Sequence, residues 1–193
     1  MKSPGSDQVR PTSDRLRETI FNILLHAYGN PVERANVIDL FAGTGAMGLE
    51  ALSRGAGFAL FVERAAPACA ILRANVRTLG LECAARLLRR DARKLGIAPE
   101  GEKYGLIFLD PPYGRGLVPP VLAALQDGGW LAKNALLIIE ESASTMVRLP
   151  DGIVLAETRR FGQTQIVLAC AERDLNLARP PGSSAASALR HKG

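Results

Sequence analysis

The stretch VIDLFAGTGAMG, residues 37–48, decides the fold. Its first part, residues 37–41, is mostly apolar and predicts a buried strand that runs into a glycine-rich turn. The turn glycines Gly43, Gly45 and Gly48 have the spacing G-x-G-x-x-G. Because glycine adopts positive φ and lets a ligand approach the backbone, a strand, such a turn and a helix indicate a ligand site. The spacing alone leaves the identity of the ligand open.

Strands and helices alternate along the rest of the chain. We expect strands at 37–41, 57–63, 84–90, 105–109, 135–140, 153–160 and 163–170, and helices at 13–27, 46–54, 66–79, 117–126 and 128–132. Alternation of this kind predicts an α/β fold with a parallel sheet that is covered on both faces. The short Phe161–Gly162 link between the last two strands predicts an antiparallel hairpin at the end of the sheet.

Helical spacing predicts which residues the helices bury. In the helix at 13–27, the apolar face consists of Leu16, Ile20, Ile23, Leu24 and Ala27. In the helix at 66–79, we expect the inward residues to be Ala70, Ile71, Ala74 and Leu79. The helices, together with the strands, lie in one domain at 13–171, between an extended segment at 1–12 and a tail at 172–193 whose composition predicts disorder.

Composition excludes several classes of protein. No apolar run approaches the ~18–20 residues that span a bilayer, and the N-terminus lacks the apolar segment of a secretory signal. The three cysteines are widely spaced and form no C-x-x-C or Cys/His cluster, so we expect no metal site and no disulfide framework. We expect buried or partly buried thiols in a cytoplasmic protein that is a monomer. The net charge of +5 suits a polyanionic partner.

Acidic residues mark the ends of four predicted strands. Asp39 lies near the end of the first, Glu63 ends the second, Asp91 follows the third and Asp110 ends the fourth. Ligands bind outside the carboxyl ends of parallel strands, so these acids should gather at one site. Glu63 follows the first glycine by about 20 residues, the spacing of a ribose-binding acid in NAD and S-adenosylmethionine (SAM) enzymes. Asp39 favours SAM, because its carboxylate would attract an ammonium group and repel a pyrophosphate.

The tetrapeptide DPPY follows the fourth strand. Pro111 and Pro112 fix the backbone there and have no N–H groups to satisfy. The Asp110 carboxylate and nearby carbonyls are acceptors, which an exocyclic amino group needs if its lone pair is to face an electrophile. Tyr113 offers an aromatic face on which a base can stack, worth ~1–3 kcal/mol. The plainer interpretation is a rigid turn around a buried tyrosine. Because the chain also carries the glycine turn, we favour the interpretation that DPPY binds an amino group and a base.

These residues resemble known methyltransferase families. The glycine turn, Glu63 and Asp91 look like the SAM-binding half of class I methyltransferases, and DPPY resembles the motif of enzymes that methylate exocyclic amines of bases. More specifically, the chain resembles the bacterial small-subunit ribosomal RNA guanine-N2 methyltransferase family of the RsmD type. The similar segments are RPTSDRLRETIFNIL (10–24), DLFAGTGAMGLEALSRGA (39–56), FVER (61–64), DPPYGRGL (110–117) and GGWL (128–131).

The resemblance implies a Rossmann-like class I methyltransferase fold, with a seven-stranded sheet of order 3-2-1-4-5-7-6 and an antiparallel last strand. It also implies methyl transfer from SAM to N2 of one guanine in 16S rRNA of the small ribosomal subunit, with S-adenosylhomocysteine as the product. The cofactor-binding residues would be Asp39, Phe41, Ala42, Gly43, Thr44, Gly45, Glu63, Arg64, Asp91 and Ala92. The catalytic residues would be Asp110, Pro111, Pro112 and Tyr113.

Arginines near the predicted cleft and along one edge are candidates to hold RNA phosphates. They are Arg10, Arg15, Arg17, Arg115, Arg159 and Arg160. Members of the RsmD-type family usually carry a basic strand or hairpin before the R-P-T segment, which the nine residues MKSPGSDQV do not match. We therefore expect RNA contacts from that region to be reduced.

Three other functions stay open. DPPY also suits methylation of adenine N6, although the chain shows no separate target-recognition domain. A non-catalytic RNA-binding or ribosome-assembly factor with a vestigial SAM site is the second. A dehydrogenase that binds NAD through the glycine turn is the third and ranks last, because DPPY has no role in hydride transfer.

Overall fold

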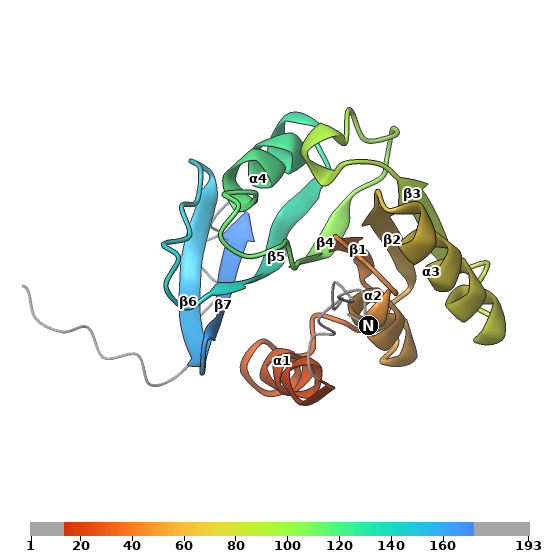
Figure 1. The fold of residues 1–193 in the computed structure, drawn as a ribbon, viewed down its shortest axis with the longest axis horizontal. Coiled ribbons are helices and arrows are strands. Elements are labelled where there is room, and N and C mark those ends of the chain that lie inside the picture. The colour runs from red at the N-terminus through yellow and green to blue at the C-terminus, as the bar shows by residue number, and fades with distance from the viewer. Residues whose placement is uncertain (1–13, 172–193) are drawn as a thin grey trace, which may run out of the picture.

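The predicted alternation of strands and helices is present in the computed structural model, which describes residues 14–171 (Figure 1). The strands are β1 (Asn36–Leu40), β2 (Phe58–Glu63), β3 (Ala85–Arg89), β4 (Tyr104–Leu109), β5 (Leu131–Ser142), β6 (Ile153–Phe161) and β7 (Thr164–Ala171). The helices are α1 (Asp14–Ala27), α2 (Ala46–Ser53), α3 (Ala66–Thr78) and α4 (Val118–Asp127), with a 3₁₀ turn η1 (Ala92–Lys94). The segments expected at 1–12 and 172–193, and Arg10, lie outside the described residues.

The strands form one seven-stranded sheet in the order β3-β2-β1-β4-β5-β7-β6. Strands β1 to β5 pair in parallel, and β7 is antiparallel to both of its neighbours, β5 and β6. The order and the antiparallel last strand confirm the fold implied by the family resemblance. The predicted hairpin is also present, since β6 and β7 pair from Phe161↔Thr164 onward.

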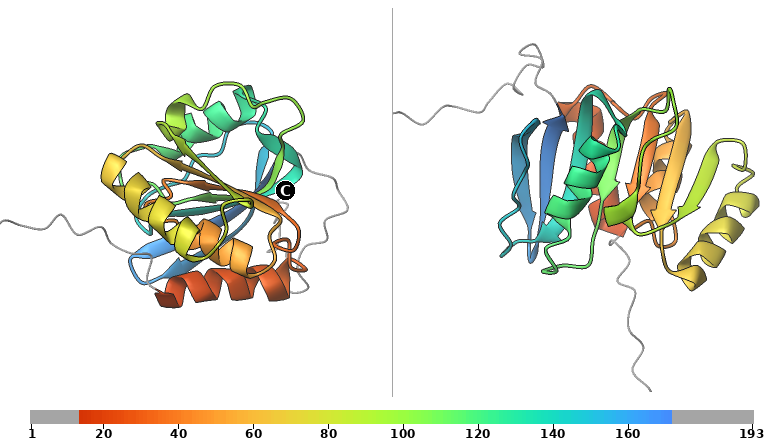
Figure 2. Two further views of the ribbon diagram at one scale, coloured as in Figure 1. Left: turned by 90° about the vertical axis from the view of Figure 1, so that its right-hand side faces the viewer. Right: turned by 90° about the horizontal axis from the view of Figure 1, so that it is seen from above.

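The helices cover both faces of the sheet, as Figure 2 shows with the sheet between α1 and α4. Buried residues of α1, α2 and α3 share one core cluster, and those of α4 belong to the other. The chain therefore winds in one direction from β1 to β3 and in the other from β4 to β5. Strands β1 and β4 are neighbours where the direction changes, and such a switch point is where open α/β sheets bind ligands.

Successive residues of a strand point to opposite faces, so the central strands feed both cores. In β1, Val37 packs beneath α1 to α3, whereas Ile38 and Leu40 pack on the α4 side. All three side chains are fully buried. Burial on both faces explains why the central strands are almost continuously apolar.

The segment 128–132, expected to be a helix, is instead a turn that leads into β5, so that prediction is wrong. Gly129 has a φ of 67°, which ends the helical path, and β5 begins at Leu131. Trp130 is held by its indole Nε1, which donates to the carbonyl of Gly96 at 2.8 Å. Gly129 stops α4, and the buried indole of Trp130 then directs the chain into the sheet.

The expected buried face of α3 is also wrong, whereas that of α1 is confirmed. In α3, Ile71 is 50% exposed and Leu79 is 57% exposed, and the buried residues are Cys69 and Leu72. The α3 sequence contains two apolar stripes of similar strength. Contact with the glycine turn selects one, because Leu72 packs where a side chain on Gly45 would stand.

Two expectations from composition have different outcomes. All three cysteines are free thiols, but Cys83 is exposed, so the expectation of burial is wrong for that residue. Within residues 14–171, no helix is both long and apolar enough to cross a membrane. The cytoplasmic location and the monomeric state stay predictions.

Gly48 provides a test of the contact between α2 and β2. A Cβ on Gly48 would lie 2.3 Å from one ring atom of Phe61, a fully buried side chain of β2. We expect Gly48→Ala to lower the free energy of unfolding by about 1–3 kcal/mol through overpacking, despite the better helix propensity of alanine. Urea unfolding measures the change.

Gly105→Ala is the matched control, because nothing lies within 4 Å of a Cβ at Gly105 on β4. We expect its unfolding free energy to stay within about 0.5 kcal/mol of the parent value, as for an ordinary uncrowded substitution. Equal stability of the two variants would contradict the tight contact at Gly48.

Candidate active site

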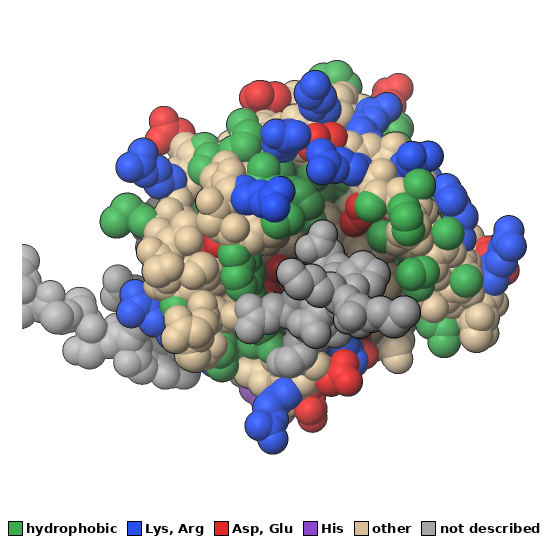
Figure 3. All heavy atoms as spheres, viewed as in Figure 1, with side chains coloured by type: hydrophobic (Ala, Val, Ile, Leu, Met, Phe, Trp, Pro, Cys, Tyr) green, Lys and Arg blue, Asp and Glu red, His purple; other side chains and the backbone are tan. Residues whose placement is uncertain are grey.

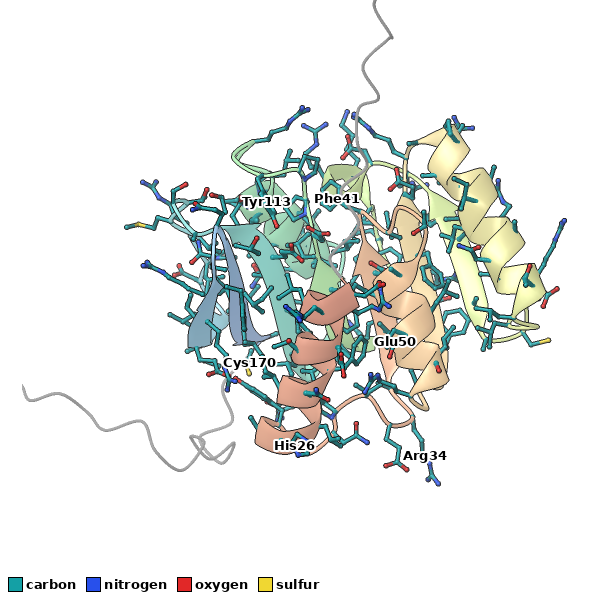
Figure 4. The ribbon with its side chains drawn as sticks, turned by 60° about the horizontal axis from the view of Figure 1, so that its bottom comes forward. His26, Arg34, Phe41, Glu50, Tyr113 and Cys170 are labelled. Atoms are coloured by element: carbon teal, nitrogen blue, oxygen red, sulfur yellow. The ribbon has the colours of Figure 1, made fainter. Side chains whose placement is uncertain are left out.

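The loops that follow β1 and β4 lie side by side at the carboxyl edge of the sheet. The backbone N–H of Asp110, directly after β4, donates to the carbonyl of Leu40, the last residue of β1, at 3.5 Å. Figure 4 shows Phe41 and Tyr113, one from each loop, at this edge, with His26 and Arg34 at the other end of the molecule. The glycine turn and the DPPY loop, residues 110–113, thus meet at the switch point of the sheet.

The glycine turn is tightly constrained. Gly45 has a φ of 87°, a conformation that favours glycine, and a Cβ there would lie 2.2 Å from Cδ1 of Leu72 and would displace that side chain. Phe41 has a φ of 60°, which is unusual for a bulky residue and is a form of strain that clusters at functional sites. The turn is tied to its neighbours, since Ala42 N–H donates to the carbonyl of Val62 and the Thr44 carbonyl accepts from Asn75.

Glu63, at the end of β2, connects the glycine turn to α3. One carboxylate oxygen accepts from the N–H of Gly43 at 3.0 Å, and the other accepts from the N–H of Ala65 at 2.6 Å. A carboxylate oxygen has two lone pairs, so each oxygen keeps one acceptor position. The carboxylate is therefore fixed in direction and able to accept from hydroxyl groups of a ligand.

Asp39 lies beneath the turn instead of at its surface. The residue is only 3% exposed, and its Oδ2 accepts from the N–H of Gly48 in α2 at 2.9 Å. Burial raises the pKa of Asp39 from 3.8 to about 7; the Gly48 hydrogen bond lowers it and the charge of Glu63 raises it further. Asp39 thus braces the start of α2 with a carboxyl group that titrates near neutral pH.

Asp91 follows β3 and caps η1. Its carboxylate accepts from the backbone N–H of Arg93 at 3.0 Å and from the Arg93 guanidinium at 2.6 Å, and Arg64 lies 3.8 Å away. These hydrogen bonds from Arg93 are the main reason that the pKa of Asp91 falls well below its usual range. Asp91 is therefore an ionised acceptor on the same edge as Glu63. Ala92 is buried behind it.

The DPPY loop is held by two acids that were not predicted from the sequence. Tyr113 donates its hydroxyl hydrogen to Glu140, and Glu141 accepts from the N–H of Gly114 at 3.1 Å. Both glutamates lie near the carboxyl end of β5. The rule that identified the four other acids would have found them, since the predicted strand at 135–140 ends in Glu140.

The loop residues differ in exposure. Asp110 and Tyr113 are partly buried, Pro111 is buried and Pro112 is exposed. Burial, the hydrogen bond to Glu140 and the nearby Glu140 charge raise the pKa of Tyr113, whereas Thr164 lowers it. The phenol therefore stays protonated and acts as a donor.

The described candidate RNA-binding arginines come from three separate parts of the chain, which are α1, the loop after β4, and β6. Arg17 pairs with Asp14 at 2.9 Å, and Arg159 pairs with Glu157 at 2.9 Å, so nearby acids offset both charges. Arg160 is exposed beside a cavity of about 440 Å³ between the 143–147 segment and strands β6 and β7. Arg15 and Arg115 are exposed.

Further exposed cations lie at the end of β3 and directly after β2 and β3. They are Arg64, Arg89, Arg90, Arg93 and Lys94. Figure 3 shows Lys and Arg side chains gathered along the upper rim of the molecule, above α4 and β3. The run RLLRRDARK at 86–94 signals this basic character, although its arginines were not among the predicted phosphate contacts. Within the described residues, no group of three His, Cys, Asp or Glu side chains is placed to hold a metal ion.

Comparison with known proteins gives consistent matches. Residues 1–170 match the protein family described as "Conserved hypothetical protein 95". "Ribosomal RNA small subunit methyltransferase D" of Escherichia coli K12 is 40% identical over 137 residues, which make up 71% of this chain and 66% of that protein. The match thus spans slightly less than two thirds of that relative.

Two further matches cover more of the proteins compared. "Putative rRNA methyltransferase YlbH" of Bacillus subtilis 168 is 31% identical over 173 residues, or 87% of this chain and 91% of that protein. The solved structure of "Putative methyltransferase yhhF from Escherichia coli" has a TM-score of 0.73 and 34% identity, with 89% of each chain covered.

Asp39→Asn tests the buried carboxyl group. The folded pKa of about 7 lies above the ordinary value of 3.8, so this group stabilises the fold below about pH 4 and its contribution is lost as the pH rises through about 7. An asparagine cannot ionise, and its amide oxygen can still accept from Gly48. We therefore expect the free energy of unfolding of the variant, relative to that of the parent protein, to be higher at about pH 8 than at about pH 5.

Urea unfolding of both proteins at the two pH values measures this gain. The difference between the two free energies of unfolding cancels the titration of every group that is not coupled to Asp39. A difference that is the same at both pH values would show that Asp39 does not titrate in this range.

Proposed function

The chain belongs to the Conserved hypothetical protein 95 family, and we propose a function on that basis. The protein transfers a methyl group from SAM to the exocyclic N2 amine of a guanine in 16S rRNA. The observation that carries the proposal is the junction of the glycine turn with the DPPY loop, joined by the Asp110–Leu40 backbone contact. A cofactor site and a set of amine acceptors thereby share one edge of the sheet.

The residues at the ends of β1, β2 and β3 fit SAM. Glu63 is fixed by Gly43 and Ala65 and would accept from the ribose hydroxyls, and Asp91 would accept from the adenine amino group. Gly45 keeps the turn free of a side chain. When bound, SAM supplies an electrophilic methyl group on its sulfonium sulfur.

The methionine end of SAM would lie over the glycine turn. Because Asp39 is buried beneath the turn, we assign it an indirect role: it holds the turn and attracts an ammonium group through the intervening backbone or a water molecule. The remaining residues that would line the cofactor are Phe41, Ala42, Thr44, Arg64 and Ala92.

The DPPY loop would receive the base. A guanine within a stacked helix cannot reach the cofactor, so the target must be unpaired or flipped out. Tyr113 would stack on it, and the Asp110 carboxylate and the Pro111 carbonyl would accept from N2. The nitrogen lone pair would then face the methyl group in line, so most of the acceleration comes from positioning. Asp110 would stabilise the positive charge that develops on nitrogen and accept the proton.

Asp110→Ala tests the acceptor role. We expect methyl incorporation to fall by at least about 100-fold, as for the loss of a general base, while SAM binding is retained. The assay measures tritiated methyl transfer from SAM to small subunits from a strain that lacks this protein, with calorimetry for SAM binding. Asp127→Ala, an exposed acid at the end of α4, should keep full activity. Full activity of Asp110→Ala would rule out the assigned role.

Nucleoside analysis of the methylated product separates the remaining functions. N2-methylguanine supports the proposal, and N6-methyladenine supports the adenine alternative. SAM binding without incorporation into any small-subunit substrate supports a non-catalytic assembly factor. Binding of NAD in place of SAM supports a dehydrogenase.

Arg115→Ala tests phosphate binding beside the DPPY loop. Arg115 is exposed between Gly114 and Gly116, and removal of one phosphate contact should reduce the slope of log affinity against log salt by about 0.7–0.9. Filter binding of an rRNA fragment at several salt concentrations measures the slope. Arg34→Asn is the control, because Arg34 lies at the opposite end of the molecule (Figure 4) and asparagine tolerates its φ of 58°. An equal change in both variants would contradict a local contact.

A further inference from the structure

Two consecutive residues of β5 form hydrogen bonds to the last residue of the DPPY loop, Tyr113, and to the residue that follows it, Gly114. Glu140 accepts from the hydroxyl of Tyr113, and Glu141 accepts from the N–H of Gly114 at 3.1 Å. Because adjacent strand residues point to opposite faces of a sheet, the two carboxylates contact this segment from opposite faces of β5. Glu141 is itself held, because the same oxygen accepts from the N–H of Ser142 at 2.8 Å.

Burial of the Glu140 and Glu141 carboxylates is energetically unfavourable by itself. Glu140 is 7% exposed and Glu141 is 1% exposed, at the end of a strand that is otherwise apolar from Ala135 to Ile139. A buried carboxylate destabilises a fold unless hydrogen bonds satisfy it. For both residues, the donors include groups of the DPPY loop or the glycine that follows it, so the fold uses these acids to hold that loop.

The hydroxyl of Tyr113 has a second neighbour. It lies 3.2 Å from Oγ1 of Thr164, the first residue of β7, which pairs with Ser142 of β5. The hydroxyl therefore sits where β5 and β7 meet, between two oxygen atoms from different strands. These two contacts hold the hydroxyl end of the ring in place, and the ring itself is half-buried and starts from a proline-constrained backbone.

We propose that Glu140 is a positioning residue, which fixes the ring of Tyr113 in the orientation needed to stack on the target base, while Glu141 fixes the backbone of the same loop. The inference rests on the proposed function, because it assigns the ring a base as its partner. A ring that is ordered before the base arrives loses less entropy on binding, and the exocyclic amine is then held at a defined distance from the methyl group. Glu140 itself touches neither the base nor the cofactor.

Three variants separate the role of the aromatic ring from that of the tether, by which we mean the hydrogen bond from the Tyr113 hydroxyl to Glu140. Tyr113→Phe keeps the aromatic face and loses the hydroxyl, Glu140→Ala removes the acceptor, and Glu140→Gln keeps an amide oxygen that can accept. We expect the first two to lower kcat by about 10–100-fold with SAM affinity within about twofold of the parent value, as expected when orientation is lost. Glu140→Gln should restore most of the activity. Glu33→Ala, an exposed glutamate outside the site, is the matched control.

The double variant Tyr113→Phe with Glu140→Ala decides whether the two residues act together. If the hydroxyl and the carboxylate form one tether, the double variant loses no more activity than the worse single variant. Losses that multiply would overturn the proposal, as would full activity of Tyr113→Phe. Urea unfolding of each variant checks that the sheet is intact, and Thr164→Val gives a milder test should Glu140→Ala fail to fold.

A readout without activity distinguishes failure of this inference from failure of the proposed function. In protein with ¹³C-labelled tyrosine, the ring resonance missing from Tyr113→Phe identifies Tyr113, and Glu140→Ala should shift and broaden it whereas Glu140→Gln should not. An unchanged resonance in Glu140→Ala would show that there is no tether. A resonance that responds as expected in a protein without methyl transfer would support the tether and contradict the proposed function.

Discussion

Parallel pairing of β1 with β4 is the constraint on which the candidate site depends. The two strands run in register from Val37↔Leu106 to Leu40↔Leu109, so their carboxyl ends finish at the same level. The chain leaves β1 toward α2 on one face and approaches α4 from β4 on the other, which opens the edge between them. At the base of this opening, the Asp110–Leu40 backbone contact joins the two loops. The acids at the ends of the neighbouring parallel strands lie along the same edge.

Buried or constrained carboxylates then hold the loops. Asp39 braces α2 through Gly48, Glu63 ties Gly43 to the start of α3, and Glu140 and Glu141 tie Tyr113 and Gly114 to β5. Each bond joins a loop or a helix start to a strand end of the rigid sheet. Such support keeps ligand-binding groups close to one geometry, which positional catalysis requires.

Much of the fold was predictable, because its signals are local. Continuous apolar runs identified the central strands, and the spacing of Ile20, Ile23 and Leu24 identified the inner face of α1. The strand order came from the family resemblance and is confirmed by the sheet. The errors at 128–132 and on α3 arose where local patterns were ambiguous and where Trp130 and Leu72 make contacts that are distant in sequence.

The sequence by itself determined the α/β class, the glycine turn, the acids at the ends of the first four strands and the DPPY loop, since each depends on residue type and spacing along the chain. Tertiary structure decided what those residues touch. It placed Asp39 beneath the turn and brought Glu140 against Tyr113 from 27 residues away. Contacts of this kind depend on strand register and burial, which no local pattern encodes.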